Sequence, residues 1–391
     1  MKRNALRVVL AAVWLLAGGL ALAQDIDVNR VVSELEPEIE RAMLEGKIPS
    51  CAVALVAGEE IVWTGAYGHS NLWARTPAVP STVYLIGSTF KTMATAALLQ
   101  QMEQGKFGLD DPVRDYLDDG LSIAGEDPGQ PVTFRHLLTH TSGLPGGFGP
   151  HTVWGASVPD PIEDYLKRSL RAVSPPMDEV RYSNLAYTLI AHLVEKFSGT
   201  PFQEYMQKNI FEPLQMSDTV FEPAGAVEER LSIPYALDDD TGRPVPAVRL
   251  KADVWPAGIV YGTVLDQARW LRAVLNGGRY RDQTILKPET VAQTLGRQYE
   301  KFAGPMHADW GNQGAGYGLT WWTCRKEGER HFAHSGSVPG YTAFLEGNAD
   351  RRLGFAILTN GHRAHPHLVR LADRAIRLMK QYDRAVEAGG K

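Results

Sequence analysis

Cysteine is scarce in this sequence, and neither sign of charge is in large excess. Only Cys51 and Cys324 occur in 391 residues, which excludes a scaffold held together by several disulfides. Both fall in strand-like segments, where cysteine suits buried apolar positions, so we expect two unpaired thiols. The net charge is −5 with no block of like charges, which argues against nucleic-acid binding. The hydrophobic share of 44% is that of an ordinary globular protein, long enough for two lobes.

The motifs of several enzyme classes are also absent. The sequence has no Gly-x-Ser-x-Gly elbow, no His-Glu-x-x-His pair and no phosphate-binding loop. His136 and His140 have a spacing that can hold a metal on one helix face, but no nearby acid or cysteine completes the set. His362, His365 and His367 are expected in a solvated loop. We therefore expect no metal and no cofactor.

The first residues differ in character from the rest. Lys2, Arg3 and Arg7 precede an apolar run over residues 8–22, which ends in an Ala-x-Ala site at residues 21–23. This order predicts a secretory signal peptide over residues 1–23, and an exported, periplasmic or secreted chain over residues 24–391. The alternative is an uncleaved membrane anchor, for which the run is short.

Hydrophobic periodicity predicts strands near both ends of the chain and helices between them. Two β-rich runs near the start, separated by Gly58-Glu59-Glu60, predict a hairpin. Strands at both ends indicate one antiparallel sheet flanked by helices, an α/β (α+β) fold with a mainly helical lobe inserted. The expected lobes are 24–90 plus 285–391, and 91–284. The expected helices are 31–44, 184–197 and 368–379, and the expected strands are 51–57, 61–67, 319–324, 331–334, 341–347 and 354–359.

Ser88-Thr89-Phe90-Lys91 is the strongest candidate for chemistry. Ser88 is the only serine followed by lysine three positions later, at the start of an apolar helix that stops at Gly105. A hydroxyl is a poor nucleophile until a base takes its proton, and a lysine amine does this only when its surroundings hold it partly neutral. The alternative is an N-capping serine beside a solvated lysine.

Tyr182-Ser183-Asn184 is the only Tyr-x-Asn in the chain, and it leads into a predicted helix. A tyrosine near Lys91 can act as a phenolate-like base for Ser88, because a neighbouring ammonium favours the ionised phenol. The same group can return the proton to the leaving atom. Asn184 offers a donor and an acceptor to a substrate amide or to Lys91. The alternative is a loop tyrosine before an asparagine helix cap.

His334-Ser335-Gly336-Ser337 is the only His-x-Gly segment, at the end of a strand-like run. An edge strand can pair with an extended substrate, and glycine lets the two backbones come close. The Ser337 amide can then join the Ser88 amide in an oxyanion hole. The alternative is a polar strand end followed by the turn at residues 338–340.

These three motifs, in this order, resemble those of the penicillin-binding-protein and class C β-lactamase superfamily of serine hydrolases. The resemblance covers nearly all of the mature chain, with further similar stretches at 133–145, 182–197, 211–214 and 256–258. It implies a β-lactamase/DD-peptidase-like fold and an exported serine hydrolase acting on an ester or a D-amino-acid amide. It also implies that Ser88 is the nucleophile, Lys91 its activating partner and Tyr182 the general base and acid. Asn184 would contact the substrate. His334, Ser335 and Gly336 would line the strand beside the substrate, and Ser337 would give an oxyanion amide.

Three positions depart from the family's usual pattern. The third motif of its β-lactamases usually starts with lysine, whereas His334 is mostly neutral at pH 7 unless its pKa is shifted. This favours peptidase or esterase work over antibiotic hydrolysis. If the substrate carries a carboxylate, we expect binding to weaken as pH rises through the pKa of His334. Gln215 and Ile259 each stand where many relatives have glycine.

The expected partner is a small-molecule or peptide substrate, with peptidoglycan fragments as one source. Neither a nucleic acid nor an integral membrane partner is expected. Two alternatives stay open. One is a β-lactamase that hydrolyses β-lactam antibiotics, and the other is a non-catalytic, penicillin-binding-like envelope protein.

Overall fold

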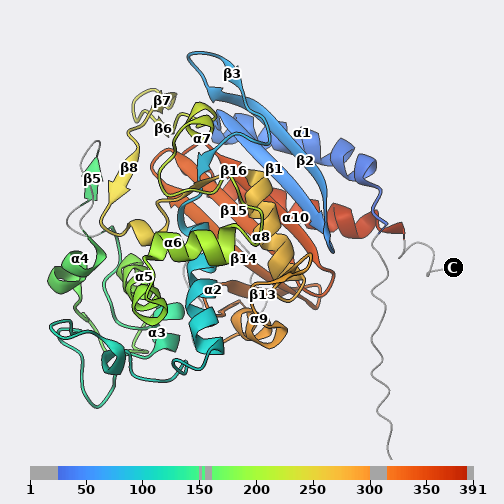
Figure 1. Ribbon diagram of the computed structural model, residues 1–391. Helices are drawn as coiled ribbons and strands as arrows, with labels where there is room; N and C mark the ends of the chain where they lie inside the picture. Colours follow the sequence, from blue (N-terminus) through green and yellow to red (C-terminus); the bar gives the residue numbers. More distant parts are fainter. Residues whose placement is uncertain (1–24, 149–151, 155–160, 300–314, 385–391) are drawn as a thin grey trace, which may run out of the picture.

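An eight-stranded antiparallel sheet forms the centre of the molecule (Figure 1). The computed structural model describes residues 25–148, 152–154, 161–299 and 315–384, so the expected signal peptide lies outside the described residues. The strand order is β12-β13-β14-β15-β16-β1-β2-β3. These strands are Gly316–Tyr317, Trp322–Lys326, Glu329–Val338, Tyr341–Asn348, Leu353–Thr359, Ser50–Ala57, Glu60–Asn71 and Thr76–Pro77, in that order.

The two ends of the chain meet inside this sheet, as the sequence predicts. Strand β1 pairs with β16, with Val53 opposite Ile357, and forms the predicted hairpin with β2. All eight residues of β1 are buried, because other elements pack against its apolar side chains on both faces of the sheet. Helix α1 (Val28–Gly46) and helix α10 (His365–Gln381) pack together on one face.

Alternate residues of β1 divide between two hydrophobic cores. Cys51, Val53 and Leu55 pack with the helices α1 and α10, whereas Ala52 and Ala54 belong to the larger core on the other face. This is the period-2 alternation of a strand buried on both sides. Helix α8 (Val264–Leu275) covers the second face, against β1 and β16. The fold is therefore layered, with helices on both faces of the sheet.

The middle of the chain is mainly helical and is built around α2, which is buried on nearly all sides. Helix α5 (Asn184–Ser198) packs along α2. The lobe boundaries expected at 90/91 and 284/285 stay a prediction. Short ladders pair β4 with β9, β5 with β8, β6 with β7 and β10 with β11. The helices are α2 (Phe90–Glu103), α3 (Phe134–Leu138), α4 (Ile162–Ser169), α5 (Asn184–Ser198), α6 (Phe202–Met206), α7 (Ala226–Glu229) and α9 (Pro288–Leu295); the short turns are Gly87–Thr89, Val113–Tyr116, Gln207–Phe211 and Trp255–Ala257; and the small strands are β4 (Tyr84–Leu85), β5 (Thr152–Trp154), β6 (Tyr235–Leu237), β7 (Pro244–Pro246), β8 (Leu250–Ala252), β9 (Tyr261–Gly262), β10 (Arg279–Tyr280) and β11 (Gln283–Thr284).

One detail of the sequence prediction needs correction. His365 and His367 do not lie in a loop but begin helix α10, where Pro366 suits the first turn because its missing N–H costs nothing there. His362 precedes that helix. Both cysteines are buried free thiols, as expected, and burial raises the pKa of each to about 12. Among the described residues, no helix is long and apolar enough to span a membrane.

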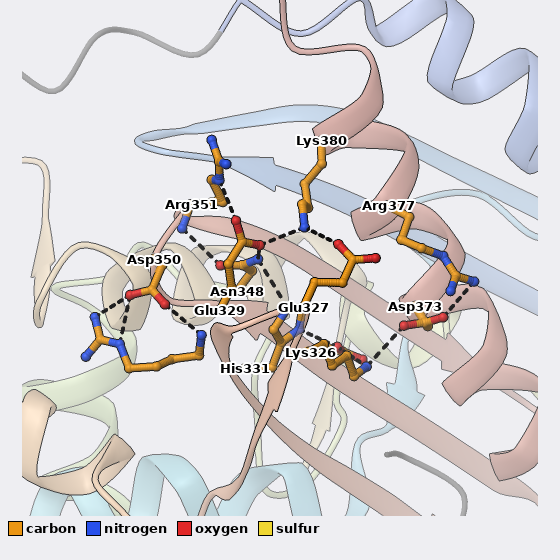
Figure 2. Close-up of polar contacts among 12 residues, drawn as sticks. Lys326, Glu327, Glu329, His331, Asn348, Asp350, Arg351, Asp373, Arg377 and Lys380 are labelled. Carbon is orange, nitrogen blue, oxygen red and sulfur yellow. Dashed lines mark hydrogen bonds and ion pairs between the residues drawn. The ribbon is translucent and has the colours of Figure 1, made fainter. Parts of the chain in front are cut away.

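A polar network ties α10 to the sheet at one end of β14 (Figure 2). Its centre is Glu346 of β15, whose side chain is fully buried. Glu346 Oε1 accepts a hydrogen bond from Lys326 Nζ at 2.6 Å and lies 2.9 Å from His331 Nδ1. Lys326 also reaches Asp373 of α10, and Lys380 of α10 pairs with acids of β14 and the preceding turn. The network lies at the opposite end of β14 from Ser337 and belongs to the frame of the molecule.

Candidate active site

Three glycines let three backbone segments meet around Ser88. A Cβ on Gly336 of β14 would lie 2.1 Å from the carbonyl oxygen of Ile86, and a Cβ on Gly258 would lie 2.6 Å from the carbonyl carbon of Gly87. Gly87 itself has a φ of +59°, which glycine adopts without strain. Side chains at these positions would push β14 and the turn at 255–258 away from Ser88. The glycines therefore build the floor of the site.

Ser88 lies in the turn at 87–89, half-buried, and α2 begins two residues later. Lys91, in the first turn of α2, is completely buried, and its Nζ lies 3.0 Å from Ser88 Oγ. The same nitrogen donates to the carbonyl of Ala257 at 2.6 Å and lies 5.0 Å from the centre of the Tyr182 ring. Burial holds the pKa of Lys91 well below its usual value. A neutral amine is thereby favoured beside the serine hydroxyl.

Tyr182 is half-buried, with its hydroxyl out of contact with solvent. Burial raises the pKa of Tyr182, by more than its interaction with Ser88 lowers it. The phenolate expected from the sequence depends on a charged ammonium at Lys91. Burial disfavours both the ammonium of Lys91 and the phenolate of Tyr182. The two pKa shifts therefore favour the opposite protonation states, with a neutral amine on Lys91 and a protonated phenol on Tyr182.

His334 lies beyond the last pair between β13 and β14, which is Trp322 with Ala333. From His334 onward, β14 has β15 on one side and lies against the Ser88 turn, which matches the expected free edge beside the nucleophile. The His334 ring is buried, stacks on Trp322 with centres 5.4 Å apart, and its Nδ1 lies 2.7 Å from the Ser335 carbonyl. Burial, with Lys91 adding to it, lowers the pKa of His334 to about 3.

This shift corrects the pH expectation drawn from the sequence. A histidine with a pKa of about 3 stays neutral at every pH above about 5. His334 therefore carries no positive charge that attracts a substrate carboxylate, and its titration does not weaken binding near neutral pH.

Asn184 is placed differently from the expectation. It is the first residue of α5, and its Nδ2 donates to the carbonyl of Gly147 at 2.9 Å. The side-chain amide therefore holds the loop that contains Gly147 rather than Lys91. The helix cap is Ser183, whose Oγ accepts from the N–H of Ala186 and donates to the carbonyl of Pro145. A substrate contact through Asn184 stays a prediction.

Several residues of the site were not recognised from the sequence. The Ala257 carbonyl lies 166 positions from Lys91, and only the likeness of the 256–258 stretch to the family pointed to it. Tyr187 packs its ring 5.3 Å from Lys91 Nζ, and Trp322 supports His334. The sequence indicates His140 only as a metal-ligand candidate and as part of the family-like stretch 133–145, although its ring centre lies 4.1 Å from that of Tyr182. Local sequence carries no signal for such long-range contacts.

The two histidines considered for a metal make hydrogen bonds to backbone amides instead. His136 Nδ1 accepts from the N–H of Thr133 in the capping box of α3, and His140 Nδ1 accepts from the N–H of Ser183. Within the part of the chain that the structure describes, no three His, Cys, Asp or Glu side chains gather closely enough to hold a metal ion.

The arrangement is suited to nucleophilic acyl transfer. A hydroxyl lies against a buried amine, a phenol lies close to both, and the backbone of β14 approaches the backbone nitrogen of Ser88 at Gly336. A nucleophile, a base, an acid and nearby backbone N–H groups are the parts such a reaction needs.

Comparison with known proteins agrees with this geometry. The sequence profile of the family described as Beta-lactamase matches residues 35–378. A protein of Homo sapiens named beta-lactamase-like 1 is 27% identical over 89% of this chain and 70% of its own length. The Unguisins hydrolase ungD of Aspergillus violaceofuscus is 29% identical over 65% of this chain and 47% of its own. The penicillin-binding protein PbpX of Bacillus subtilis is 26% identical over 60% of this chain and 56% of its own.

A solved structure extends the likeness to three dimensions. The octameric penicillin-binding protein homologue from Pyrococcus abyssi superposes with a TM-score of 0.75 and 29% sequence identity, covering 90% of this chain and 78% of that one. The chain thus spans between about half and four fifths of the length of these relatives.

Proposed function

This chain belongs to the Beta-lactamase family, and on that premise we propose that it is a serine hydrolase that forms an acyl-enzyme at Ser88. One observation carries the proposal: the fully buried amine of Lys91 lies 3.0 Å from Ser88 Oγ. A relative named as a hydrolase and another named as a penicillin-binding protein support the same class of reaction.

In the first step, Ser88 Oγ attacks the acyl carbon while its proton passes to the neutral amine of Lys91. The carbonyl π bond opens, and the negative charge goes to the oxygen. The backbone N–H groups of Ser88 and Ser337 stabilise that oxygen, since preorganised donors act most strongly where charge develops. Gly87 and Gly336 support this assignment, because they let the two segments that carry these amides lie against each other.

In the second step, the bond to the leaving group breaks and the leaving atom takes a proton from the Tyr182 phenol. Lys91, now an ammonium, returns the first proton to Tyr182, whose ring lies 5.0 Å from Lys91 Nζ. The site is then neutral again, with the acyl group on Ser88. Water releases the acyl group by the same steps in reverse order, with Tyr182 or Lys91 accepting the water proton.

For the substrate, we propose an ester or a D-amino-acid-containing amide or peptide, of carboxypeptidase or esterase type. The support is His334, which stands where the β-lactamases of the family usually have a lysine. Peptidoglycan fragments are one source of such amides. A β-lactamase is the competing assignment within the same chemistry, and a non-catalytic envelope protein is the competing assignment outside it.

A labelling experiment tests the proposed function. A fluorescent fluorophosphonate should label the wild-type chain and leave Ser88→Ala unlabelled, whereas a non-catalytic protein leaves both unlabelled. A panel of a nitrophenyl ester, a D-Ala-D-Ala peptide and a chromogenic cephalosporin then separates the substrate classes. Turnover of the cephalosporin faster than that of the ester and the peptide would overturn the substrate assignment.

We also propose that the chain is exported, on the support of the basic, apolar and Ala-x-Ala order of residues 1–23. Expression of the full chain in a bacterium, followed by cell fractionation and N-terminal sequencing, should give a periplasmic or secreted protein that begins at Gln24. A product that keeps residues 1–23 and stays in the cytoplasm would contradict export.

A further inference from the structure

His140 holds the backbone on both sides of Tyr182. Its carbonyl oxygen accepts from the N–H of Arg181 at 2.8 Å, and its Nδ1 accepts from the N–H of Ser183 at 3.1 Å. These are the two amides that flank Tyr182 in the chain. Tyr182 belongs to no helix or strand, since α5 begins only at Asn184. Hydrogen bonds from outside the segment must therefore fix its position.

The imidazole of His140 also packs on the tyrosine itself. The two ring centres are 4.1 Å apart with the planes inclined by 36°, and the His140 side chain is completely buried. Nε2 has no hydrogen-bond partner among the described residues, so the bond from Ser183 to Nδ1 is the one that orients the ring. The hydrogen bonds that His140 makes with the 181–183 segment are thus those to Arg181 and Ser183, while its ring centre also lies 5.6 Å from those of Tyr187 and Tyr317.

His140 has an uncommon backbone conformation. Its φ is +57°, in the left-handed region that residues other than glycine seldom adopt, although asparagine, aspartate and histidine are found there more often than the rest. Burial, with smaller contributions from Lys91 and His334, holds the pKa of His140 well below its usual value. Nδ1 therefore stays unprotonated and keeps its role as an acceptor through the neutral range.

We propose that His140 is a positioning residue that holds Tyr182 beside Ser88 and Lys91. The proposal rests on the proposed function for its kinetic consequence, because a proton passes through Tyr182 in that mechanism. The hold on the backbone itself is a structural claim that is measured separately.

Two variants of the same position isolate the acceptor. Asparagine and glycine both tolerate a φ of +57°, and both remove the imidazole ring. Only asparagine places an oxygen where Nδ1 lies, because Oδ1 is also two bonds from Cβ. His140→Asn should therefore keep the bond from Ser183, and His140→Gly should lose it.

The first readout is residue-resolved hydrogen exchange of the Ser183 amide. We expect faster exchange in His140→Gly than in the wild type, and near-wild-type protection in His140→Asn. The second readout is ester hydrolysis. A displaced catalytic group costs on the order of 100-fold in rate, so we expect that loss in the kcat of His140→Gly with KM changed less than about threefold. We expect the kcat of His140→Asn to lie at least about tenfold above that of His140→Gly.

His136→Ala is the matched control. His136 also accepts a backbone N–H through Nδ1, from Thr133 at 3.2 Å, but it does so in the cap of α3. Its loss should raise exchange at Thr133 and leave kcat and the Ser183 amide unchanged.

Equal exchange of Ser183 in His140→Asn and His140→Gly, or equal kcat in the two, would overturn the proposal. A kcat loss in His136→Ala as large as that in His140→Gly would reduce His140 to general support of the fold and would also overturn it. If the wild type hydrolyses nothing and takes no label at Ser88, the proposed function fails, while the exchange comparison still decides whether His140 holds the segment.

Discussion

The amine of Lys91 lies 3.0 Å from the hydroxyl of Ser88 and is completely shielded from solvent. Its other close polar contact is a carbonyl, that of Ala257, which is uncharged. Burial without an opposite charge lowers the pKa of an amine. The relationship therefore favours a neutral amine beside the proposed nucleophile, which an exposed Ser-x-x-Lys does not have.

Replacing Lys91 by methionine should abolish most of the reactivity of Ser88. The side chain keeps a similar shape, but the group that accepts the serine proton is gone. General-base catalysis contributes about 10²- to 10⁴-fold, so the rate of fluorophosphonate labelling should fall by about 10³-fold. Lys106→Met is the matched control, because Lys106 is a half-buried lysine that donates to Gln101 and plays no part in the proposed chemistry. Equal labelling of wild type and Lys91→Met would contradict the role of the amine.

His334 should contribute no charge to substrate binding between pH 5 and 8. Its pKa is lowered to about 3, so it becomes protonated only as pH falls towards that value. The measurement is the ratio of two KM values, one for an ester that carries a carboxylate and one for its neutral analogue. We expect this ratio to follow the same pH profile in wild type and His334→Asn. Profiles that diverge as pH falls through 6.5 would show a histidine that titrates normally and would contradict the shifted pKa.

Gly336→Ala should damage the site by moving β14. The new Cβ would lie 2.1 Å from the carbonyl oxygen of Ile86 and 3.1 Å from the Ser88 nitrogen, so the strand must shift away from the nucleophile. Displacement of about 1 Å costs on the order of 100-fold in rate, and overpacking costs about 1–3 kcal/mol in the free energy of unfolding. Labelling kinetics and urea denaturation measure the two effects. Gly129→Ala, in an exposed turn whose nearest neighbour is the flexible side chain of Asp127, should change neither.

Glu346→Gln should lower stability without lowering activity. Burial alone would raise the pKa of Glu346, but Lys326 and His331 lower it further than burial raises it, so the carboxylate is charged in the folded protein. Breaking a buried ion pair costs about 3–5 kcal/mol. Urea denaturation should show a loss of that order, while kcat at 25 °C stays within about twofold, because the network lies at the far end of β14.

A double variant serves as the control for Glu346. Glu346→Leu combined with Lys326→Met removes both charges and should recover much of the lost stability, since replacing a buried pair with apolar groups is often neutral. Wild-type stability in Glu346→Gln, or a large drop in its kcat, would contradict this separation of frame and site.

Much of the sheet is predictable from the sequence because its strands are locally apolar. The hairpin over residues 50–71 and strand β16 follow from β-branched and apolar runs. Strand β14 is longer than predicted, since it runs from Glu329 through the polar residues at 334–337 to Val338. Those residues have no strand pattern of their own. Pairing with β15 imposes the conformation on them, and a local pattern cannot reveal such pairing.

The site is predictable only where its residues are close in sequence. Ser88 and Lys91 are brought together by one turn, so their spacing predicts their contact. Ala257 and His140 reach the same site through the fold, and the residues themselves are ordinary. Gln215 is an intermediate case: its φ is +57°, a conformation that suits the glycine expected there from the resemblance, and this chain adopts it with a glutamine.

The central claim is an acyl-enzyme at Ser88, and trapping that intermediate tests it most directly. The protein would be mixed with a slowly hydrolysed nitrophenyl ester, quenched in acid within milliseconds to seconds, and examined by intact-mass and peptide mass spectrometry. The account predicts a mass increase equal to one acyl group, located on the peptide that contains Ser88 and absent from Ser88→Ala. Turnover of the ester with no acyl group on that peptide, or with the same acyl group retained in Ser88→Ala, would contradict it.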